Sequence, residues 1–236
     1  MKKPMILPVG SSPAVTYAAL ELERSGYLLT DAPAPEVTHI LLDVPCRDSA
    51  EELTFLLQRL PESITAIGGN LPDLPCRCID LLQDPGYLAE NAAITAHCAL
   101  RLILDALPVT LQDLPVLIVG WGRIGKCLAA LLRAVGARVT VAARKETDRA
   151  MLTALGYGSC PIVCDNDYRV IVNTVPEMVL PQCPDEALKL DLASRPGLGG
   201  QDVISARGLP GKYAPESAGR LIAKTILNKL KSEDIL

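Results

Sequence analysis

Three glycines in the stretch "LIVGWGRIGKCLAALL" have the spacing of a phosphate-binding loop. They follow the pattern G-x-G-x-x-G, in which a backbone without side chains can closely approach a pyrophosphate. The preceding "PVLIVG" is typical of a buried strand. The residues after the loop are typical of a helix, whose first amide groups would donate to the phosphate. A glycine-rich turn that binds nothing is the alternative. The residues predicted to contact a dinucleotide are Gly120, Gly122, Arg123, Ile124 and Gly125.

The end of the following strand, "ARVTVAAR", indicates which dinucleotide this site would take. A site that prefers NAD normally places Asp or Glu there, to accept hydrogen bonds from the ribose hydroxyls. This chain has Arg144 and Lys145 instead, and two cations would attract a 2′-phosphate. We therefore predict NADP as the cofactor, with NAD as the alternative. The two cations have an alternative interpretation as a solvated surface pair.

Another strand, "RVIVN", ends in residues that we predict to contact the same cofactor. In a dinucleotide-binding fold this position borders the nicotinamide ribose. The residues are Asn173, Thr174 and Pro176, and an ordinary turn after the strand is the alternative. Both histidines precede the glycine loop, so the late histidine that commonly moves a proton in 2-hydroxy-acid dehydrogenases is missing.

The apolar pattern divides the chain into two α/β units that would position these residues. Strand-like and helix-like segments alternate in both, which is typical of parallel sheets. We predict an α/β fold of two domains, a smaller flavodoxin-like N-terminal domain and a Rossmann dinucleotide-binding domain, joined by two helices. The predicted boundaries are 1–107 for the first domain with its linking helix at 88–107, 108–212 for the second, and 213–236 for a helix that returns to the first. In the first domain, strands are expected at 4–10, 39–45 and 65–70, and helices at 13–26 and 49–60.

Composition restricts the partners of the chain. Its 236 residues carry a net charge of −4 without a basic cluster, so we expect neither nucleic acid nor an anionic membrane as a partner. No apolar run reaches the roughly 18 residues of a membrane span, and the N-terminal apolar stretch is too short for a signal peptide. We therefore expect a cytoplasmic protein, and a homo-oligomer.

The eight cysteines are scattered and contain no C-x-x-C pair. In a cytosolic protein such cysteines are expected to be reduced and mostly buried as small hydrophobic residues. We therefore predict no metal site. The alternative is a site built from Cys76 and Cys78, or from the pair Cys160 and Cys164.

Three further segments resemble one known family. They are "VIVNTVPEMVL" at 170–180, "LDLASRPGLGG" at 190–200 and "ARGLPGKYAPESAGRLIA" at 206–223. Taken in this order, they resemble the A subunit of bacterial dipicolinate synthase, whose fold is related to that of the two-domain D-2-hydroxyacid dehydrogenases. The resemblance extends from about 91 to 230, and the part before it is shorter than in the usual family member.

The resemblance implies a sporulation enzyme. The family makes pyridine-2,6-dicarboxylate (dipicolinate) by oxidising a cyclic dihydro or tetrahydro product of the lysine-pathway synthase. It uses NAD(P) and works with a flavoprotein-like B subunit. A non-catalytic dinucleotide-binding or scaffold subunit is one alternative. A related dehydrogenase of another small dicarboxylate is the second.

A dicarboxylate substrate requires cations and hydrogen-bond donors near the nicotinamide. Arg195 follows the expected strand "LDLAS", at the carboxyl end where ligands of parallel sheets bind. An ion pair between the domains is its alternative role. Gly208, Pro210 and Gly211 are expected to form a tight loop whose amides face a carboxylate, with Ser217 as a further donor. Ser217 is alternatively an ordinary residue in the first turn of a helix.

One segment departs from the family pattern. "NAAITAHCAL" is similar to the family's N-A-x-x-T-A-E-G-A segment, with His97 in place of Glu and Cys98 in place of Gly. If that Glu removes a proton during oxidation, His97 could act as the base near neutral pH. The alternative is a histidine between the domains, with its hydrogen bonds satisfied and no catalytic role. Cys98 is expected to pack rather than to act as a nucleophile.

Overall fold

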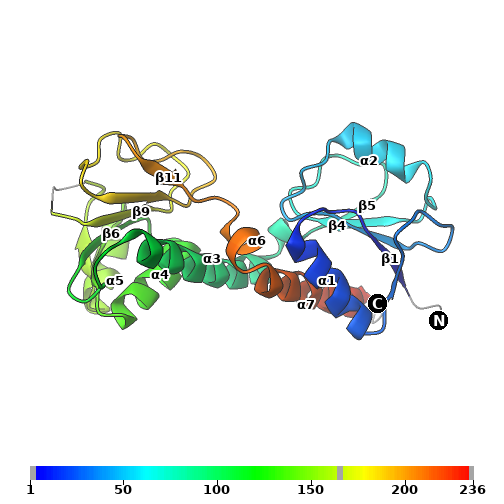
Figure 1. Cartoon of the computed structure of the whole chain (residues 1–236), viewed down its shortest axis with the longest axis horizontal. Helices are drawn as coiled ribbons and strands as arrows, with labels where there is room; N and C mark the ends of the chain where they lie inside the picture. The colour runs from blue at the N-terminus through cyan, green and yellow to red at the C-terminus, as the bar shows by residue number, and fades with distance from the viewer. Residues whose placement is uncertain (1–3, 164–166, 234–236) are drawn as a thin grey trace. The chain divides into compact units, whose positions relative to one another are not determined.

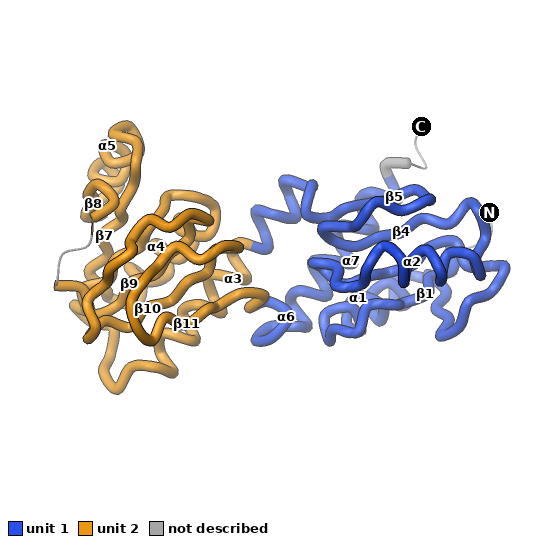
Figure 2. Tube along the Cα trace, turned by 90° about the horizontal axis from the view of Figure 1, so that it is seen from above, with its two compact units in different colours: residues 1–91, 210–236 blue, residues 92–209 orange. Residues whose placement is uncertain are grey.

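The computed structural model describes residues 4–163 and 167–233, which fall into two compact units. Figure 2 distinguishes them by colour. One, called unit 1 here, consists of the residues up to 91 together with those from 210. The other, unit 2, consists of residues 92–209. Unit 1 is therefore assembled from two separate segments of the chain, whereas unit 2 is continuous.

Unit 1 contains a parallel sheet with the strand order β2-β1-β3-β4-β5. The order 2-1-3-4-5 is that of flavodoxin-like folds, so the predicted fold of this part is confirmed. The expected strands correspond to β1, β3 and β4. The edge strands β2 and β5 were not predicted, because they are short and mostly outside the core. The bounds are β1 (Met5–Pro8), β2 (Leu28–Leu29), β3 (His39–Leu41), β4 (Thr65–Gly68) and β5 (Arg77–Asp80).

The two helices expected near the N-terminus are present as α1 (Pro13–Arg24) and α2 (Ala50–Leu57). Helix α2 begins with a capping box, because the Ser49 hydroxyl accepts from the Glu52 N–H and the Glu52 carboxylate accepts from the Ser49 N–H. A 3₁₀ turn, η1 (Leu81–Gln83), follows β5. In unit 1 the C-terminal helix α7 (Pro215–Glu233) packs against α1.

Unit 2 contains a parallel sheet with the strand order β11-β10-β9-β6-β7-β8. Numbered from its first strand, this is the Rossmann order 3-2-1-4-5-6 read from the opposite edge, so the fold prediction is confirmed here as well. Helix α5 and strands β8 and β11 were not predicted. The elements are β6 (Pro115–Val119), α4 (Arg123–Ala134), β7 (Arg138–Ala142), α5 (Glu146–Ala154), β8 (Gly158–Cys160), β9 (Val170–Asn173), β10 (Leu188–Asp191) and β11 (Val203–Ser205).

The two faces of this sheet are covered differently. Helices α4 and α5 lie on one side of it (Figure 1). On the other face, Leu117 and Val119 of β6 pack against Leu180, Ala187 and Leu198, which belong to the connections after β9 and β10. In the described residues these connections contain no helix. The segment that carries Arg195 is therefore part of a covering layer of loops.

Two further helices complete the described chain. Helix α3 (Pro85–Ala106) begins before the expected 88–107, and the boundary between the units falls inside it. Helix α6 (Leu209–Tyr213) occupies the segment that we expected to be a tight loop. Among the described residues, no helix has both the length and the apolar character needed to cross a membrane.

Candidate functional site

The carboxyl ends of neighbouring strands in unit 2 meet in one row across the sheet. Val119 of β6 is in register with Ala142 of β7 on one side and with Asn173 of β9 on the other. Asn173 is in turn in register with Asp191 of β10. From β6 the strands are added toward one edge of the sheet, and from β9 toward the other, and such a switch point in strand order is where open α/β sheets bind ligands.

The three glycines of the loop after β6 have different structural roles. Gly120 has φ +103°, and a Cβ there would lie 2.5 Å from the Thr174 hydroxyl oxygen. A Cβ on Gly125 would collide with the Gly120 carbonyl oxygen, so Gly125 allows α4 to approach the loop. A Cβ on Gly122 would instead enter open space. This open position is the one that a pyrophosphate requires, because the ligand itself must fit beside the backbone.

The start of α4 is suited to an anion. Its N-cap is Gly122, which has no side chain to accept from the first amides, and its first turn contains no acidic residue. Arg123, the first residue of the helix, is exposed, and Ile124 is half-buried. The free amides and the helix dipole together favour a phosphate at this position.

A cavity of about 220 Å³ lies beside the glycine loop. It is formed at the carboxyl ends of β6, β7, β8 and β9, and both predicted cations contribute to its wall. Two carboxylates, those of Asp148 and Glu177, also line it. The full lining is Gly120, Trp121, Ala143, Arg144, Lys145, Asp148, Ile162, Val175, Glu177 and Val179.

Contacts within unit 2 hold the backbone of the cavity wall that carries Arg144 and Lys145. Arg149 donates from Nη1 to the carbonyl oxygens of Ala143 and Arg144, both at 2.8 Å. Lys145 is the N-cap residue of α5. The side chains of Arg144 and Lys145 are exposed, so a phosphate at the cavity mouth could meet both of them.

Trp121, between the first two glycines, forms another part of the wall. Its ring meets the ring of Tyr157 edge-on at 5.8 Å, and the Lys126 ammonium lies 5.7 Å from its centroid. We did not single out Trp121 from the sequence, although an aromatic residue inside a glycine loop is a usable signal. It is the sole tryptophan of the chain, which makes it a natural fluorescent reporter of this cavity.

Asn173, predicted to contact the cofactor, lies at the end of β9. It is fully buried, and its amide group is used within the protein. Its Nδ2 donates to the Val175 carbonyl and to the Asp191 carboxylate, and its Oδ1 accepts from the Val175 N–H. A side chain with these partners shapes the loop after β9, and a contact between this residue and the cofactor stays a prediction.

The two neighbours of Asn173 lie differently. The Thr174 hydroxyl donates to the Val119 carbonyl at 2.9 Å, so it ties the loop after β9 to the glycine loop. Pro176 is exposed and does not line the cavity, whereas Val175 and Glu177 on either side of it do.

The residues expected to hold the substrate are divided between the two units. Arg195 is exposed on the loop after β10, and Gly208, with φ +65°, also lies in unit 2. Pro210, Gly211 and Ser217 lie in unit 1. The structure corrects the expected tight loop: Pro210 and Gly211 belong to the short helix α6, in which the Ala214 N–H donates to the Pro210 carbonyl. Proline at the start of a helix loses no hydrogen bond, which explains why this sequence turns helical. Ser217 is exposed in the first turn of α7.

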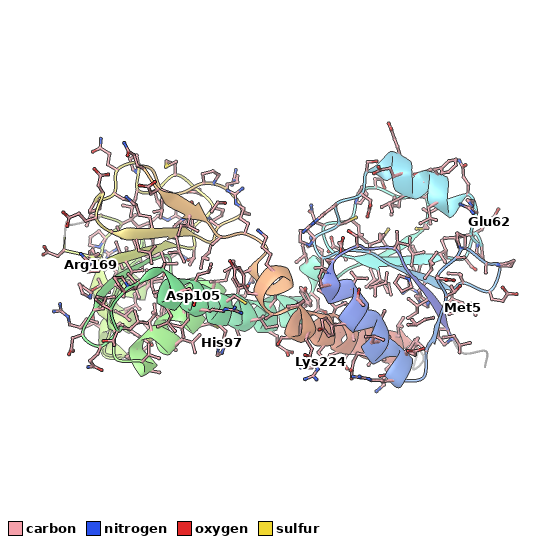
Figure 3. The ribbon with its side chains drawn as sticks, viewed as in Figure 1. Met5, Glu62, His97, Asp105, Arg169 and Lys224 are labelled. Carbon is pink, nitrogen blue, oxygen red and sulfur yellow. The ribbon has the colours of Figure 1, made fainter. Side chains whose placement is uncertain are left out.

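His97 is exposed on α3 and lies in unit 2. Figure 3 shows it on that helix, with Asp105 farther along. The next residue, Cys98, is buried, and burial raises the pKa of its thiol. A raised pKa disfavours the reactive thiolate, which supports the packing role expected for Cys98.

The other cysteines bear on the metal alternative. No group of three potential ligands from His, Cys, Asp and Glu comes together in residues 4–163 and 167–233. Cys164 lies outside the described residues. Partial desolvation of the sulfur and the neighbouring Cys76 raise the pKa of the Cys78 thiol to about 11, so this thiol is protonated at neutral pH.

Comparison with known proteins supports the resemblance found in the motifs. No family model matches the chain. The A subunit of dipicolinate synthase from Bacillus subtilis is 33% identical to it over 176 residues, which are 66% of this chain and 58% of that protein. The match therefore spans less than two thirds of the length of this curated relative.

Solved structures match the fold over nearly the whole chain. The crystal structure of the dipicolinate synthase A subunit from Bacillus halodurans superposes with a TM-score of 0.81 at 19% identity, covering 96% of this chain and 97% of that one. The apo-structure of D-lactate dehydrogenase from Escherichia coli gives 0.60 at 14% identity, covering 98% and 97%. Over the matched residues in sequence, and over nearly the whole chain in fold, this chain is similar to the A subunit of dipicolinate synthase.

Proposed function

We propose that the chain is a nicotinamide-dinucleotide-dependent oxidoreductase subunit of the dipicolinate synthase A type. It oxidises a cyclic dihydro or tetrahydro precursor to dipicolinate, with NADP as the preferred cofactor. The observation that carries this proposal is the glycine loop, where open space at Gly122 adjoins helix amides without a capping side chain. The sequence similarity to the A subunit of dipicolinate synthase supports the proposed substrate.

The residues around the cavity fit such a cofactor. Gly120, Gly122 and Gly125 would hold its pyrophosphate at the start of α4, and Arg144 and Lys145 would bind the 2′-phosphate. When bound, the nicotinamide supplies a hydride acceptor. Unit 2 contributes the walls that orient it, because Thr174 fastens the loop after β9 to the glycine loop.

A dicarboxylate substrate brings two negative charges that need partners. Arg195, exposed at the carboxyl end of β10, would neutralise one carboxylate. The N–H groups of Gly208 and Gly211 and the Ser217 hydroxyl are the proposed donors to the other carboxylate, and Pro210, which has no N–H, would only help to position them. Conversion of the dihydro form to the aromatic ring removes one hydride and one proton. His97, which is exposed on α3, is available to accept the proton. A flavoprotein-like B subunit is the proposed partner.

The test follows nicotinamide absorbance when the chain, a B-type subunit, NADP⁺ and the cyclic precursor are mixed. From a dihydro precursor we expect NADPH and dipicolinate to form in equal amounts, and from a tetrahydro precursor two NADPH for each dipicolinate. In a parallel titration, NADPH should quench Trp121 fluorescence. Quenching without product formation would favour the scaffold alternative. The absence of both signals would exclude the proposed cofactor and the proposed reaction together.

A further inference from the structure

Asp191 is a buried carboxylate that the mechanism above does not use. It is the last residue of β10 and only 3% exposed. Its Oδ1 accepts from the Asn173 Nδ2 at 2.9 Å and from the Ala193 N–H at 3.1 Å. Its Oδ2 accepts from the N–H groups of Gly197 at 2.7 Å and Leu198 at 3.3 Å. Four donors surround this one carboxylate, which is the condition under which a buried charge is tolerated.

These donors lie on both sides of Arg195 in the chain. Ala193 precedes Arg195 by two residues, and Gly197 follows it by two. One carboxylate thus closes the loop 193–198 at both ends, with Arg195 at its middle. A further bond from the Arg207 Nε to the Ala193 carbonyl, at 3.0 Å, holds the same loop from the side of β11.

The same carboxylate is connected to the wall of the candidate dinucleotide cavity. Asn173, which donates to Asp191, also bonds to both the N–H and the carbonyl of Val175. Val175 lines the cavity. The two loops are in direct contact as well, because a Cβ on Gly197 would lie 2.8 Å from the Val175 carbonyl oxygen and 2.6 Å from that of Glu177.

We propose that Asp191 is a positioning residue, which holds the Arg195 loop in a fixed place against the cavity loop 174–177. This inference rests on the proposed function, in which Arg195 binds a substrate carboxylate. Asp191 itself touches neither substrate nor cofactor. Its role is to keep the Arg195 guanidinium at one distance from the place of hydride transfer, where a displacement of about 1 Å can cost a large factor in rate.

The variant that tests this is Asp191→Asn. It keeps the size of the side chain but replaces one acceptor oxygen by an NH₂ group, which must then face an N–H donor. We expect the KM for the dicarboxylate substrate to rise about tenfold, while the affinity for NADPH, measured by Trp121 quenching, stays within about twofold. Asp202→Asn is the matched control, because Asp202 is exposed in the same unit, and it should change neither value.

A double-mutant cycle separates positioning from a general loss of structure. In an Arg195→Ala background, Asp191→Asn should have little further effect on KM, because both changes remove the same interaction. An equal rise of KM in both backgrounds would overturn the proposal, as would an unchanged KM in the single variant. If Asp191→Asn does not fold, hydrogen exchange of backbone amides in the wild-type protein tests the proposal instead. Slow exchange at Ala193, Gly197 and Leu198 supports the proposal, and exchange as fast as in an open loop contradicts it.

Failure of the proposed function gives a different result. In that case the wild-type protein itself binds no NADPH and oxidises no precursor, whatever stands at position 191. The hydrogen-exchange measurement does not depend on the cofactor or the substrate, so it tests the carboxylate network separately.

Discussion

At the scale of single residues, the proposed preference for NADP rests on the charges at the cavity mouth. Two cations, Arg144 and Lys145, and two carboxylates, those of Asp148 and Glu177, line the cavity. Replacing both cations by Ala should raise the Kd of NADPH at least about tenfold, because charge-assisted hydrogen bonds to a phosphate are lost. The Kd of NADH should change less than about twofold. Trp121 quenching measures both constants.

Arg101→Ala provides the control for this variant. Arg101 is an exposed cation on α3 that pairs with Asp105 at 3.6 Å, and it does not line the cavity. Its loss should leave both affinities unchanged. Equal weakening of NADPH and NADH binding in the variant with Ala at positions 144 and 145 would show that these cations do not bind the 2′-phosphate.

Residue types allowed part of this site to be predicted from the sequence. Glycine spacing specifies a backbone conformation, so the loop over 120–125 could be predicted. An asparagine at a strand end has the same local pattern whether it faces a ligand or a buried partner. The partner of Asn173 is Asp191, 18 residues away, and only the sheet register brings the two together. For this reason neither the burial of Asn173 nor the role of Asp191 was predicted.

At the scale of elements, the start of α3 gives a prediction about pH. Asp84 precedes Pro85, accepts from the Tyr87 N–H at 2.8 Å, and pairs with Lys229 of α7 at 2.8 Å. The hydrogen bond from Lys229, and then that from Tyr87, lower the pKa of Asp84. A lowered native pKa means that the charged carboxylate stabilises the fold above the unfolded pKa, and that this stability is lost as the pH falls through the native pKa.

Asp84→Asn should therefore lower the free energy of unfolding at neutral pH, although Asn still caps the helix. The difference from the wild type should be constant down to about pH 5. It should then shrink toward zero below the ordinary Asp pKa of about 3.9. Urea unfolding at several pH values measures this. Asp105→Asn, which removes the exposed pair with Arg101, should have almost the same free energy of unfolding as the wild type at every pH. A difference for Asp84→Asn that persists at low pH would contradict the account.

Helices with a clear start and an apolar stripe could be predicted, and elements that display no complete period could not. The helices α1, α2 and α4 have a clear start and an apolar stripe, which a sequence displays directly. Strand β2 has two residues and α6 has five, so neither completes a period. The helical conformation of Leu209–Tyr213 was mistaken for a loop because Gly and Pro are typical of turns and are disfavoured in helix interiors.

At the scale of the whole molecule, unit 1 depends on a close contact between distant parts of the chain. A Cβ on Gly219 of α7 would lie 2.5 Å from the Tyr17 Cβ and 2.6 Å from the Ala14 carbonyl oxygen of α1. Gly219→Val should therefore destabilise unit 1 by roughly 3 kcal/mol, because the helices must separate. Lys231→Val, at an exposed position of α7, is the matched control.

Two signals distinguish the units in this experiment. Trp121 lies in unit 2, so its fluorescence follows that unit, whereas circular dichroism follows both. We expect Gly219→Val to lower the midpoint temperature of an unfolding transition followed by circular dichroism. The midpoint of the transition followed by Trp121 fluorescence and the affinity for NADPH should stay unchanged. If the midpoint of the Trp121 transition fell by the same amount, the two units would unfold together in one step.

The fold class could be predicted because strand and helix alternate along both parts of the chain. The strand order within each sheet required the structure, since periodicity does not specify which strands are neighbours. The two short edge strands of unit 1 and the loop layer over one face of unit 2 show this limit. Both consist of segments without a repeating apolar pattern.

The most direct test of the account is NADPH binding by Gly122→Ala. The added methyl group points into open space, so we expect the melting temperature to remain within a few degrees of the wild type. In the same place it would meet the pyrophosphate, and a clash of about 1–3 kcal/mol corresponds to a Kd raised about tenfold to a hundredfold. Wild-type affinity in a folded Gly122→Ala protein would contradict the central claim that a dinucleotide lies against the start of α4.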